Sequence, residues 1–495
     1  MIPWWGLTFA VLGVNFAMWG AVGLVRLAAS LPARLHRRRE THAVAAGAMA
    51  MAVRGGATPA VGDSPAVLEA PPPTVLEAPP PTVLDAPPPS VREVAVLIPA
   101  HNEALVIEGS LRSIMTLVPQ ENVHVISDGS TDATVRIARA AGAKVIETRE
   151  NIGKAGALAE AIQRFHLIER FEVVMLLDAD TRVGRGYFAA GLPMFANPAV
   201  AAVAGCVRTS RDRKLSFTGN LVVGHRERIY AVGQHALKFG QTWLRANATP
   251  IVPGFASMYR SAVLPRMDMN PPGLVIEDFN MTFEVYQKDL GKVGFSLAAV
   301  AITQDPDNLH DYVRQTKRWA LGLWQTVRRH PPRRNLFTAM LTLLLLELVT
   351  SSLLFFLLPL ALLVLAVPEI AGSALSWPGF AEVHNAVAAH LRLSTIFFGV
   401  LVPDYVLTCA VAVLERRPRL LFFGLFFPLM RVIDALISLQ AIPLAWLARS
   451  SGRWQSPSRR PVVPTRPPAR GVMTALPSPG AGSAQRAGKG RYVSR

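Results

Sequence analysis

A chain of 495 residues with 51% hydrophobic residues, 17% charged residues and a formal net charge of +17 is apolar for a soluble enzyme. It indicates a membrane protein with a soluble part. The positive charge gathers beside apolar segments, as in residues 449–495, which hold ten Lys or Arg and no acid. This placement favours retention on the cytoplasmic side of a membrane and argues against nucleic-acid binding. The two cysteines, Cys206 and Cys409, exclude a disulfide framework and a cysteine zinc site, and they fit a reducing compartment.

The first 25 residues carry no charge, and the stretch Trp4–Val25 is long enough to cross a bilayer as a helix. Basic residues follow this stretch between Arg26 and Arg39, and none precedes it. We therefore expect a retained transmembrane anchor at residues 1–27, with its N-terminus outside and the next domain in the cytosol. The alternative is a cleaved signal peptide.

Residues 28–92 are basic at first and then rich in proline. Residues 67–90 repeat with a period of eight, as VLEAPPPT twice and VLDAPPPS once. Proline triplets favour extended polyproline conformations. The segment is therefore interpreted as a stiff linker between the anchor and the next domain, with a proline-recognition ligand as the alternative.

Residues 93–330 have the pattern of an α/β domain. Short apolar runs alternate with helical stretches, which predicts a doubly wound, mostly parallel sheet. Polar residues follow the strands, at the edge where such sheets bind ligands. The expected strands are Val94–Ile98, Val123–Ile126, Lys144–Ile146 and Val173–Leu177, with helices at Thr131–Ala141 and Ala155–Phe165.

Two carboxylates, Asp178 and Asp180, come directly after the fourth predicted strand. Carboxylates at this spacing can share a divalent cation with a nucleotide. Hard oxygen ligands suit Mg²⁺ or Mn²⁺, and such an ion would bridge a diphosphate and stabilise its leaving charge. The alternative is a solvated turn.

Asp128 and Lys154 are candidate nucleotide contacts. Asp128 follows the second predicted strand and could accept from a base or ribose, although the same turn could simply cap the next helix. Lys154 lies in a turn that opens a helix, where a lysine can reach a phosphate. An ordinary surface lysine is the alternative there.

Glu277 and Asp278 begin another predicted helix. An acid pair at a helix start often serves only as a cap. Inverting sugar transfer, however, needs a carboxylate that takes the proton of the acceptor hydroxyl. Asp278 is the predicted general base, and Glu277 is predicted to support it.

The last motif lies on an amphipathic basic helix that ends before a long apolar run. Gln315, Arg318 and Trp319 have the spacing i, i+3, i+4 and therefore share one face, beside an apolar stripe. Trp319 could stack on a sugar, and Arg318 could neutralise a diphosphate. The alternative is plain anchoring at a bilayer surface by Trp and Arg.

Residues 331–448 are predicted to be a transmembrane region, followed by a basic, partly disordered tail at 449–495. The apolar stretches are Leu336–Val367, Leu393–Leu414 and Leu420–Leu447, and the last is not expected to cross simply. Ionisable residues interrupt them and either face a polar path for a glycan or pair with one another. These residues are Glu347, Asp404, Arg431 and Asp434.

In this order the motifs resemble the membrane-bound processive family 2 glycosyltransferases, the group with poly-N-acetylglucosamine, hyaluronan, chitin-oligosaccharide and cellulose synthases. The resemblance covers about residues 94–330 and the flanking apolar segments. Pro99–Glu103 and Asp128–Asp132 are most similar to the poly-N-acetylglucosamine branch.

The resemblance implies a GT-A fold, a UDP-sugar donor, a divalent metal and β-linked products made with inversion. It also implies the role of each site residue. On the donor side, Glu103 and Asp128 contact the uridine, Lys154 and Asp178 hold the nucleotide, and Asp180 binds the metal together with Asp178. Asp278 is the base, and Glu277 supports it. On the acceptor side, the diphosphate and the acceptor end are bound by Gln315, Arg318 and Trp319, and Gly254 lies in an acceptor-facing loop.

The predicted function is extension of a β-linked polysaccharide from a UDP-sugar, with an N-acetylglucosamine polymer favoured and export as a coupled step. The predicted location is the plasma membrane, with several spans and a cytosolic catalytic domain. Expected partners are the donor, a glycan acceptor and the bilayer, with a small membrane subunit or export partner in addition, and no nucleic acid. Two alternatives stay open: transfer of a single sugar to a lipid or short acceptor, and a catalytically silent scaffold of an export complex.

Overall fold

The computed structural model describes residues 2–30, 87–211, 214–447 and 460. All of them belong to one compact unit, Met1–Val462. Most of the predicted proline-rich linker, and the predicted basic tail apart from Arg460, lie outside the described residues.

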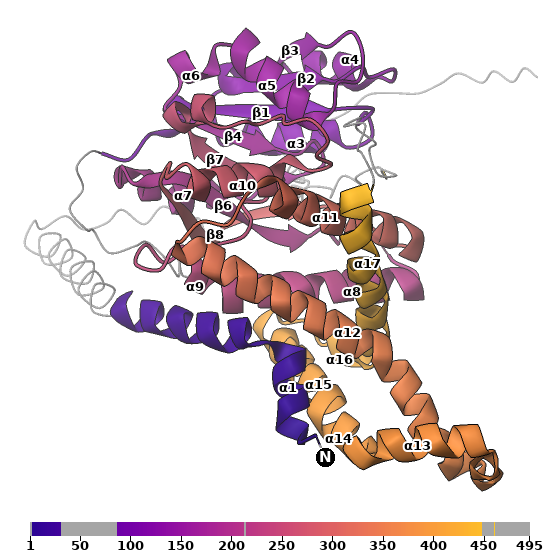
Figure 1. The fold of residues 1–495 in the computed structure, drawn as a ribbon. Coiled ribbons are helices and arrows are strands. Elements are labelled where there is room, and N and C mark those ends of the chain that lie inside the picture. The colour runs from indigo at the N-terminus through magenta and orange to yellow at the C-terminus, as the bar shows by residue number, and fades with distance from the viewer. Residues whose placement is uncertain (1, 31–86, 212–213, 448–459, 461–495) are drawn as a thin grey trace, which may run out of the picture. The chain divides into compact units, whose positions relative to one another are not determined.

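An eight-stranded mixed sheet forms the centre of the catalytic part (Figure 1). Its order is β3-β2-β1-β4-β7-β6-β8-β5. The first four strands in this order are parallel, as predicted, but β7 is antiparallel to both neighbours and β5 is antiparallel to β8. The sheet is thus mixed: β6 and β8 are parallel to each other, and the antiparallel strands β7 and β5 flank this pair. The strands are β1 (Val94–Ala100), β2 (Val123–Ser127), β3 (Lys144–Glu147), β4 (Val173–Leu177), β5 (Arg182–Val183), β6 (Val200–Thr209), β7 (Ala256–Arg260) and β8 (Lys292–Thr303).

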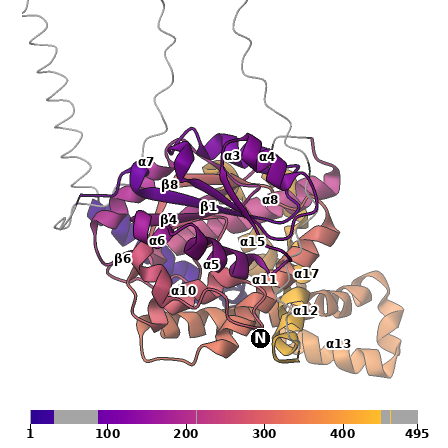
Figure 2. The same cartoon turned by 90° about the horizontal axis from the view of Figure 1, so that it is seen from above.

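Helices cover both faces of the sheet (Figure 2). Successive side chains of a strand point to opposite faces. Accordingly, Ala95 and Leu97 of β1 lie in one buried cluster with residues of two helices, α5 and α10. Val94, Val96 and Ile98 lie in a second cluster with residues of α3 and α4. The helices are α3 (Ile107–Ile114), α4 (Thr134–Ala140), α5 (Lys154–Arg164), α6 (Leu167–Arg170), α7 (Tyr187–Gly191) and α10 (Glu277–Gln287).

The remaining helices either lie next to the sheet or form a mostly apolar region beyond it (Figure 1). Among the described residues, three helical segments are long and apolar enough to cross a membrane: Leu336–Ile370, Leu393–Leu414 and Arg419–Leu447. Trp324 of α11 packs against Ala441 and Ala445 of α17. These helices are α8 (Phe217–Val232), α9 (Phe239–Gln241), α11 (Leu309–Arg329), α12 (Leu336–Ile370), α13 (Pro378–His390), α14 (Leu393–Ile396), α15 (Val402–Leu414), α16 (Arg419–Phe423) and α17 (Phe427–Leu447).

The predicted N-terminal anchor is not one straight helix. α1 (Trp4–Leu12) ends at Gly13, and the helix Val14–Ser30 continues at a bend of 68°. Gly13 has a φ of +84°, a backbone conformation that residues other than glycine rarely adopt. The carboxylate of Glu347 accepts from the backbone N–H of Asn15 (2.8 Å) and from its side-chain amide (2.9 Å). Glu347 therefore satisfies polar groups that the break exposes.

The second half of this segment docks on the catalytic part. The Arg26 guanidinium donates to the carbonyl of Phe239 (2.5 Å), the hydroxyl of Thr242 (3.1 Å) and the carbonyl of Phe295 (3.2 Å). It also lies 4.2 Å from the centre of the Phe239 ring. α1 has nine residues, which rise about 14 Å, and by length and composition it can form one broken membrane span together with Val14–Ser30.

The ionisable residues of the apolar helices have partners. Asp404 accepts from Arg228 of α8 through two bonds of 2.7 Å, and from Arg431 (2.9 Å). Asp434 accepts from the hydroxyl of Tyr312 (2.7 Å) and lies 2.9 Å from the ring of His225. Of the four residues named from the sequence, Asp404 and Arg431 pair with each other, whereas Glu347 and Asp434 have other partners, so the mutual pairing holds for one pair.

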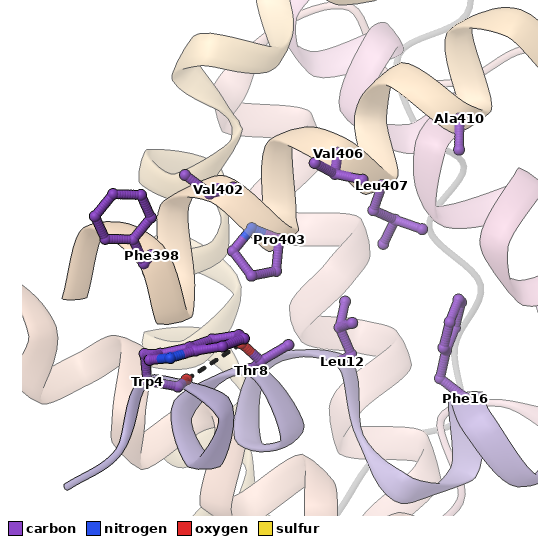
Figure 3. Close-up of a pocket in the computed structure, with 10 residues that line it drawn as sticks. All are labelled: Trp4, Thr8, Leu12, Phe16, Phe398, Val402, Pro403, Val406, Leu407 and Ala410. Carbon is purple, nitrogen blue, oxygen red and sulfur yellow. Dashed lines mark hydrogen bonds between the residues drawn. The ribbon is translucent and has the colours of Figure 1, made fainter. Parts of the chain in front are cut away.

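An apolar cavity of about 610 Å³ lies between α1 and α15 (Figure 3). Its one hydroxyl, on Thr8, donates to the carbonyls of Trp4 and Gly399, both at 3.2 Å. None of the ten residues that line the cavity is charged. Its walls include Trp4, Leu12, Phe16, Phe398, Val402 and Leu407.

Candidate active site

The predicted site residues gather at the carboxyl ends of the parallel strands. Asp128 follows β2, Asp178 and Asp180 follow β4, and Lys154 is the first residue of α5. Gly153 precedes it with a φ of +85°, a conformation that suits glycine and turns the chain sharply into the helix. The crossover topology thus places the base of α5 beside the end of β4.

Lys154 is the centre of an ion-pair cluster. Its Nζ lies 2.8 Å from Asp178 Oδ1 and 2.8 Å from Glu277 Oε1, and its side chain is 18% exposed. Burial disfavours the ammonium, but the carboxylates of Asp178, Glu277 and Asp278 outweigh it and hold the pKa of Lys154 well above its usual value. Burial likewise opposes the charge of Glu277, yet Lys154 keeps its pKa low. Both groups are therefore charged at neutral pH.

Asp278 is the acid of the cluster that can change its protonation state. Its Oδ2 accepts from the backbone N–H of Gly254 at 2.7 Å. Burial first, and then the charge of Glu277, raise the pKa of Asp278 to about 7, against the opposing effects of Lys154 and the Gly254 N–H. A pKa near the working pH is what a general base needs.

Gly254 makes room for this arrangement. A Cβ at this position would lie 2.3 Å from Asp278 Oδ1 and 3.1 Å from Lys154 Nζ. Any side chain here would displace the Asp278 carboxylate. The acceptor-facing role of Gly254 stays a prediction, and in the structure its N–H fixes the Asp278 carboxylate.

Asp178 and Asp180 form the candidate metal site. Asp180 is 8% exposed, and its Oδ1 accepts from the hydroxyls of Thr181 (3.2 Å) and Thr303 (3.4 Å). Burial raises the pKa of Asp178, and the charge of Asp180 adds to this against the attraction of Lys154. A cation would relieve that repulsion. Among the described residues no three His, Cys, Asp or Glu side chains group as metal ligands. Two carboxylates still fit Mg²⁺ or Mn²⁺, which take their other ligands from phosphate and water.

Asp128 has a structural task that the sequence did not indicate. It is fully buried, and its carboxylate accepts from the backbone N–H groups of Ile152 (2.8 Å) and Gly153 (2.9 Å) and from the Thr148 hydroxyl (3.1 Å). It thereby holds the loop that presents Lys154. Glu103 is also fully buried, and its own N–H donates to Thr134. The uridine contacts expected for Asp128 and Glu103 stay predictions.

Gln315, Arg318 and Trp319 lie on α11, as predicted. Arg318 is exposed, whereas Gln315 and Trp319 are half-buried. The guanidinium of Arg226, on α8, donates to Gln315 Oε1 at 3.2 Å and lies 4.4 Å from the centre of a Trp319 ring. Sequence reasoning missed Arg226. A signal was present in the run His225–Arg228, which places three basic groups and an acid inside one helix.

Asp305 connects this group with the metal site. It follows β8, and its Oδ1 is 3.9 Å from Nε of Arg226. Burial raises the pKa of Asp305 against the lowering effects of Arg226 and of the hydroxyls of Thr209 and Tyr230, and the charge of Asp180 adds to the rise. Asp305 was not predicted either, because it belongs to no short motif.

Residues 88–322 match the family model described as "Glycosyltransferase like family 2". The matched segment includes all eight strands and the site residues from Glu103 to Trp319. This segment is therefore a family 2 glycosyltransferase domain, which confirms the predicted fold and enzyme class. No curated protein sequence matches it.

Three solved structures are similar to this chain. A mannosyltransferase from Pyrobaculum calidifontis, in complex with GDP-Man and Mn²⁺, has 20% identity over 72% of this chain and 89% of its own, with a TM-score of 0.44. A mannosyl-3-phosphoglycerate synthase from Rubrobacter xylanophilus has 19% identity over 48% and 75%, with a TM-score of 0.33. A glucosyl-3-phosphoglycerate synthase from Mycobacterium tuberculosis, with Mn²⁺ and UDP, has 21% identity over 48% and 78%, with a TM-score of 0.31.

Proposed function

We propose that this enzyme transfers a sugar from a UDP-sugar, with inversion, to a growing β-linked polysaccharide at the cytosolic face of the plasma membrane. An N-acetylglucosamine polymer is the favoured product, and its export is coupled to synthesis. One observation carries the chemistry: the Asp278 carboxyl has a pKa of about 7 and is fixed beside the Lys154 ion pairs.

In the proposed reaction, Asp278 removes the proton of an acceptor hydroxyl as that oxygen attacks the anomeric carbon. The bond from that carbon to the phosphate oxygen breaks, and the UDP leaves with its electron pair. A single displacement of this kind inverts the anomeric configuration. Asp278 suits the task because Gly254 fixes its orientation and its pKa allows both proton uptake and release near neutral pH.

Charged side chains prearrange the part of the site that is proposed to bind the nucleotide. Lys154 supplies a buried cation at the start of α5, where the helix N-terminus also favours anions. Asp178 and Asp180 would hold Mg²⁺ or Mn²⁺. When bound, such an ion would neutralise negative charge on the diphosphate. Lys154 lowers the pKa of Asp178 and thereby offsets part of the rise that burial and the charge of Asp180 cause.

The acceptor side lies on α11, where Gln315, Arg318 and Trp319 are proposed to bind the diphosphate and the acceptor end. α11 packs on α17 through Trp324. This packing supports an acceptor path that leads from the catalytic site towards the apolar helices. The three long apolar segments support placement in a membrane.

The test uses the full chain in lipid nanodiscs with Mn²⁺ or Mg²⁺ and a panel of donors: UDP-N-acetylglucosamine, UDP-glucose, UDP-glucuronate and GDP-mannose. UDP release with one UDP-sugar, and a ladder of long products, are expected. Absence of release from every UDP-sugar overturns the proposed donor class. A product that is longer than its acceptor by one sugar replaces the polymer with the single-transfer alternative.

A further inference from the structure

Arg226 is a buried cation between two elements of the acceptor side. It lies on α8 and is 3% exposed. One of its nitrogens donates to Gln315 Oε1 (3.2 Å) and to the Thr316 hydroxyl (3.1 Å) on α11. Its guanidinium carbon lies 4.4 Å from a Trp319 ring centre and 4.6 Å from that of Tyr312. One guanidinium thus contacts four side chains of α11.

The aromatic contacts help to explain how this charge is tolerated away from water. The nearest carboxylate, of Asp305, is 3.9 Å from Nε, which is too long for a hydrogen bond. That carboxylate already accepts from the hydroxyls of Thr209 (2.6 Å) and Tyr230 (2.8 Å). The ring faces of Trp319 and Tyr312 therefore provide much of the stabilisation, because a desolvated cation is attracted to the electron-rich face of an aromatic ring.

The same cluster is tied to α17. The Tyr312 hydroxyl donates to Asp434 Oδ1 at 2.7 Å, and His225, next to Arg226 on α8, lies 2.9 Å from Asp434 Oδ2. Asp434 therefore fixes α8 and α11 to the same point on an apolar helix. Tyr312 then holds one face of the guanidinium in place.

We propose that Arg226 is a positioning residue for the acceptor. It fixes the ring plane of Trp319 and the side-chain amide of Gln315, and the contact of Tyr312 with Asp434 fixes Arg226 in turn. The inference rests on the proposed function, in which Gln315 and Trp319 bind the acceptor. It assigns Arg226 no contact with the sugar.

Arg226→Lys is the main test. A lysine keeps the charge but loses the flat, forked group that stacks and donates at fixed angles. In nanodiscs, with short N-acetylglucosamine oligosaccharides as acceptors, we expect the acceptor KM to rise about tenfold, the effect of losing one hydrogen bond to a charged group. We expect the affinity for UDP and the donor KM to stay within about twofold of wild type, since Lys154 and Arg318, the cations assigned to the nucleotide and the diphosphate, are not among the side chains that Arg226 contacts.

Arg228→Lys is the matched control, because Arg228 lies on the same helix, is also buried, and binds Asp404 of α15. It should lower thermal stability and leave the acceptor KM unchanged. An unchanged acceptor KM in Arg226→Lys, or equal loss of donor and acceptor binding, overturns the inference. A wild-type protein that releases no UDP refutes the proposed function instead.

Tyr312→Phe keeps the test decisive where Arg226→Lys fails to fold. It removes the hydroxyl that donates to Asp434 and keeps the ring against Arg226. We expect a smaller rise in acceptor KM, about threefold to tenfold, with the donor KM unchanged. A Tyr312→Phe protein with wild-type acceptor KM also overturns the inference.

Discussion

The pH dependence of transfer follows directly from the environment of Asp278. Its carboxyl must be deprotonated to accept a proton, and its pKa of about 7 is set by burial and by Glu277. The value of kcat/KM reports the free enzyme's base. The deprotonated fraction rises from about one-tenth at pH 6 to about nine-tenths at pH 8, so kcat/KM should rise about tenfold over this interval. UDP release at subsaturating donor, measured across the pH range, gives the curve.

Two variants separate the base from other titrating groups. Asp278→Asn should lower kcat by about 10²- to 10⁴-fold, the usual contribution of a general base, while the affinity for UDP is kept. Asp289→Asn is the control, since Asp289 is 81% exposed and should leave the profile unchanged. A flat profile between pH 6 and 8, or a midpoint near pH 4, would refute the reasoning. So would an Asp278→Asn enzyme that keeps more than a tenth of wild-type kcat.

Three further changes have defined outcomes. Lys154→Met removes a positive charge that lowers the pKa of Asp278, so the midpoint of the pH profile should move to higher pH. A midpoint that moves to lower pH contradicts the assigned ion pairs. Gly254→Ala places a Cβ 2.3 Å from the Asp278 carboxylate and should lower kcat at least about tenfold, with an unchanged circular dichroism spectrum. Asp404→Asn leaves the guanidinium groups of Arg228 and Arg431 without their carboxylate. It should reduce the free energy of unfolding in detergent by about 3–5 kcal/mol. A loss under about 1 kcal/mol would show that the pairing is dispensable.

The parallel half of the sheet could be predicted from the sequence almost to the residue. The expected strand Val173–Leu177 coincides with β4, and the expected helix Ala155–Phe165 is α5 displaced by one residue. These elements are apolar runs joined by local crossovers, so nearby residues determine them. β6 is rich in alanine, and β7 inserts between β4 and β6 through pairings that are distant in sequence, which no local pattern reveals.

The site was predictable in its residue types and not in its contacts. Short motifs placed Asp178 and Asp278 at the ends of elements, but their pKa values depend on Lys154, which arrives from another crossover. Arg226 was missed because its partners lie about 90 positions further along the chain. The N-terminal break was missed because one glycine, Gly13, changes the course of an otherwise apolar stretch without changing its composition.

The contacts between α8 and the last apolar helices also bear on how the chain is assembled. In the proposed membrane placement, each lone charge that enters hydrocarbon costs roughly 2.5–3.5 kcal/mol on insertion scales. α15 and α17 bring Asp404, Arg431 and Asp434, whereas Arg228 and His225 come from a helix that is translated almost two hundred residues earlier than Asp404 and Asp434. The residues that carry the counter-charges are thus synthesised before the apolar segments with which they pair. A fragment that holds the late helices alone would lack these counter-charges.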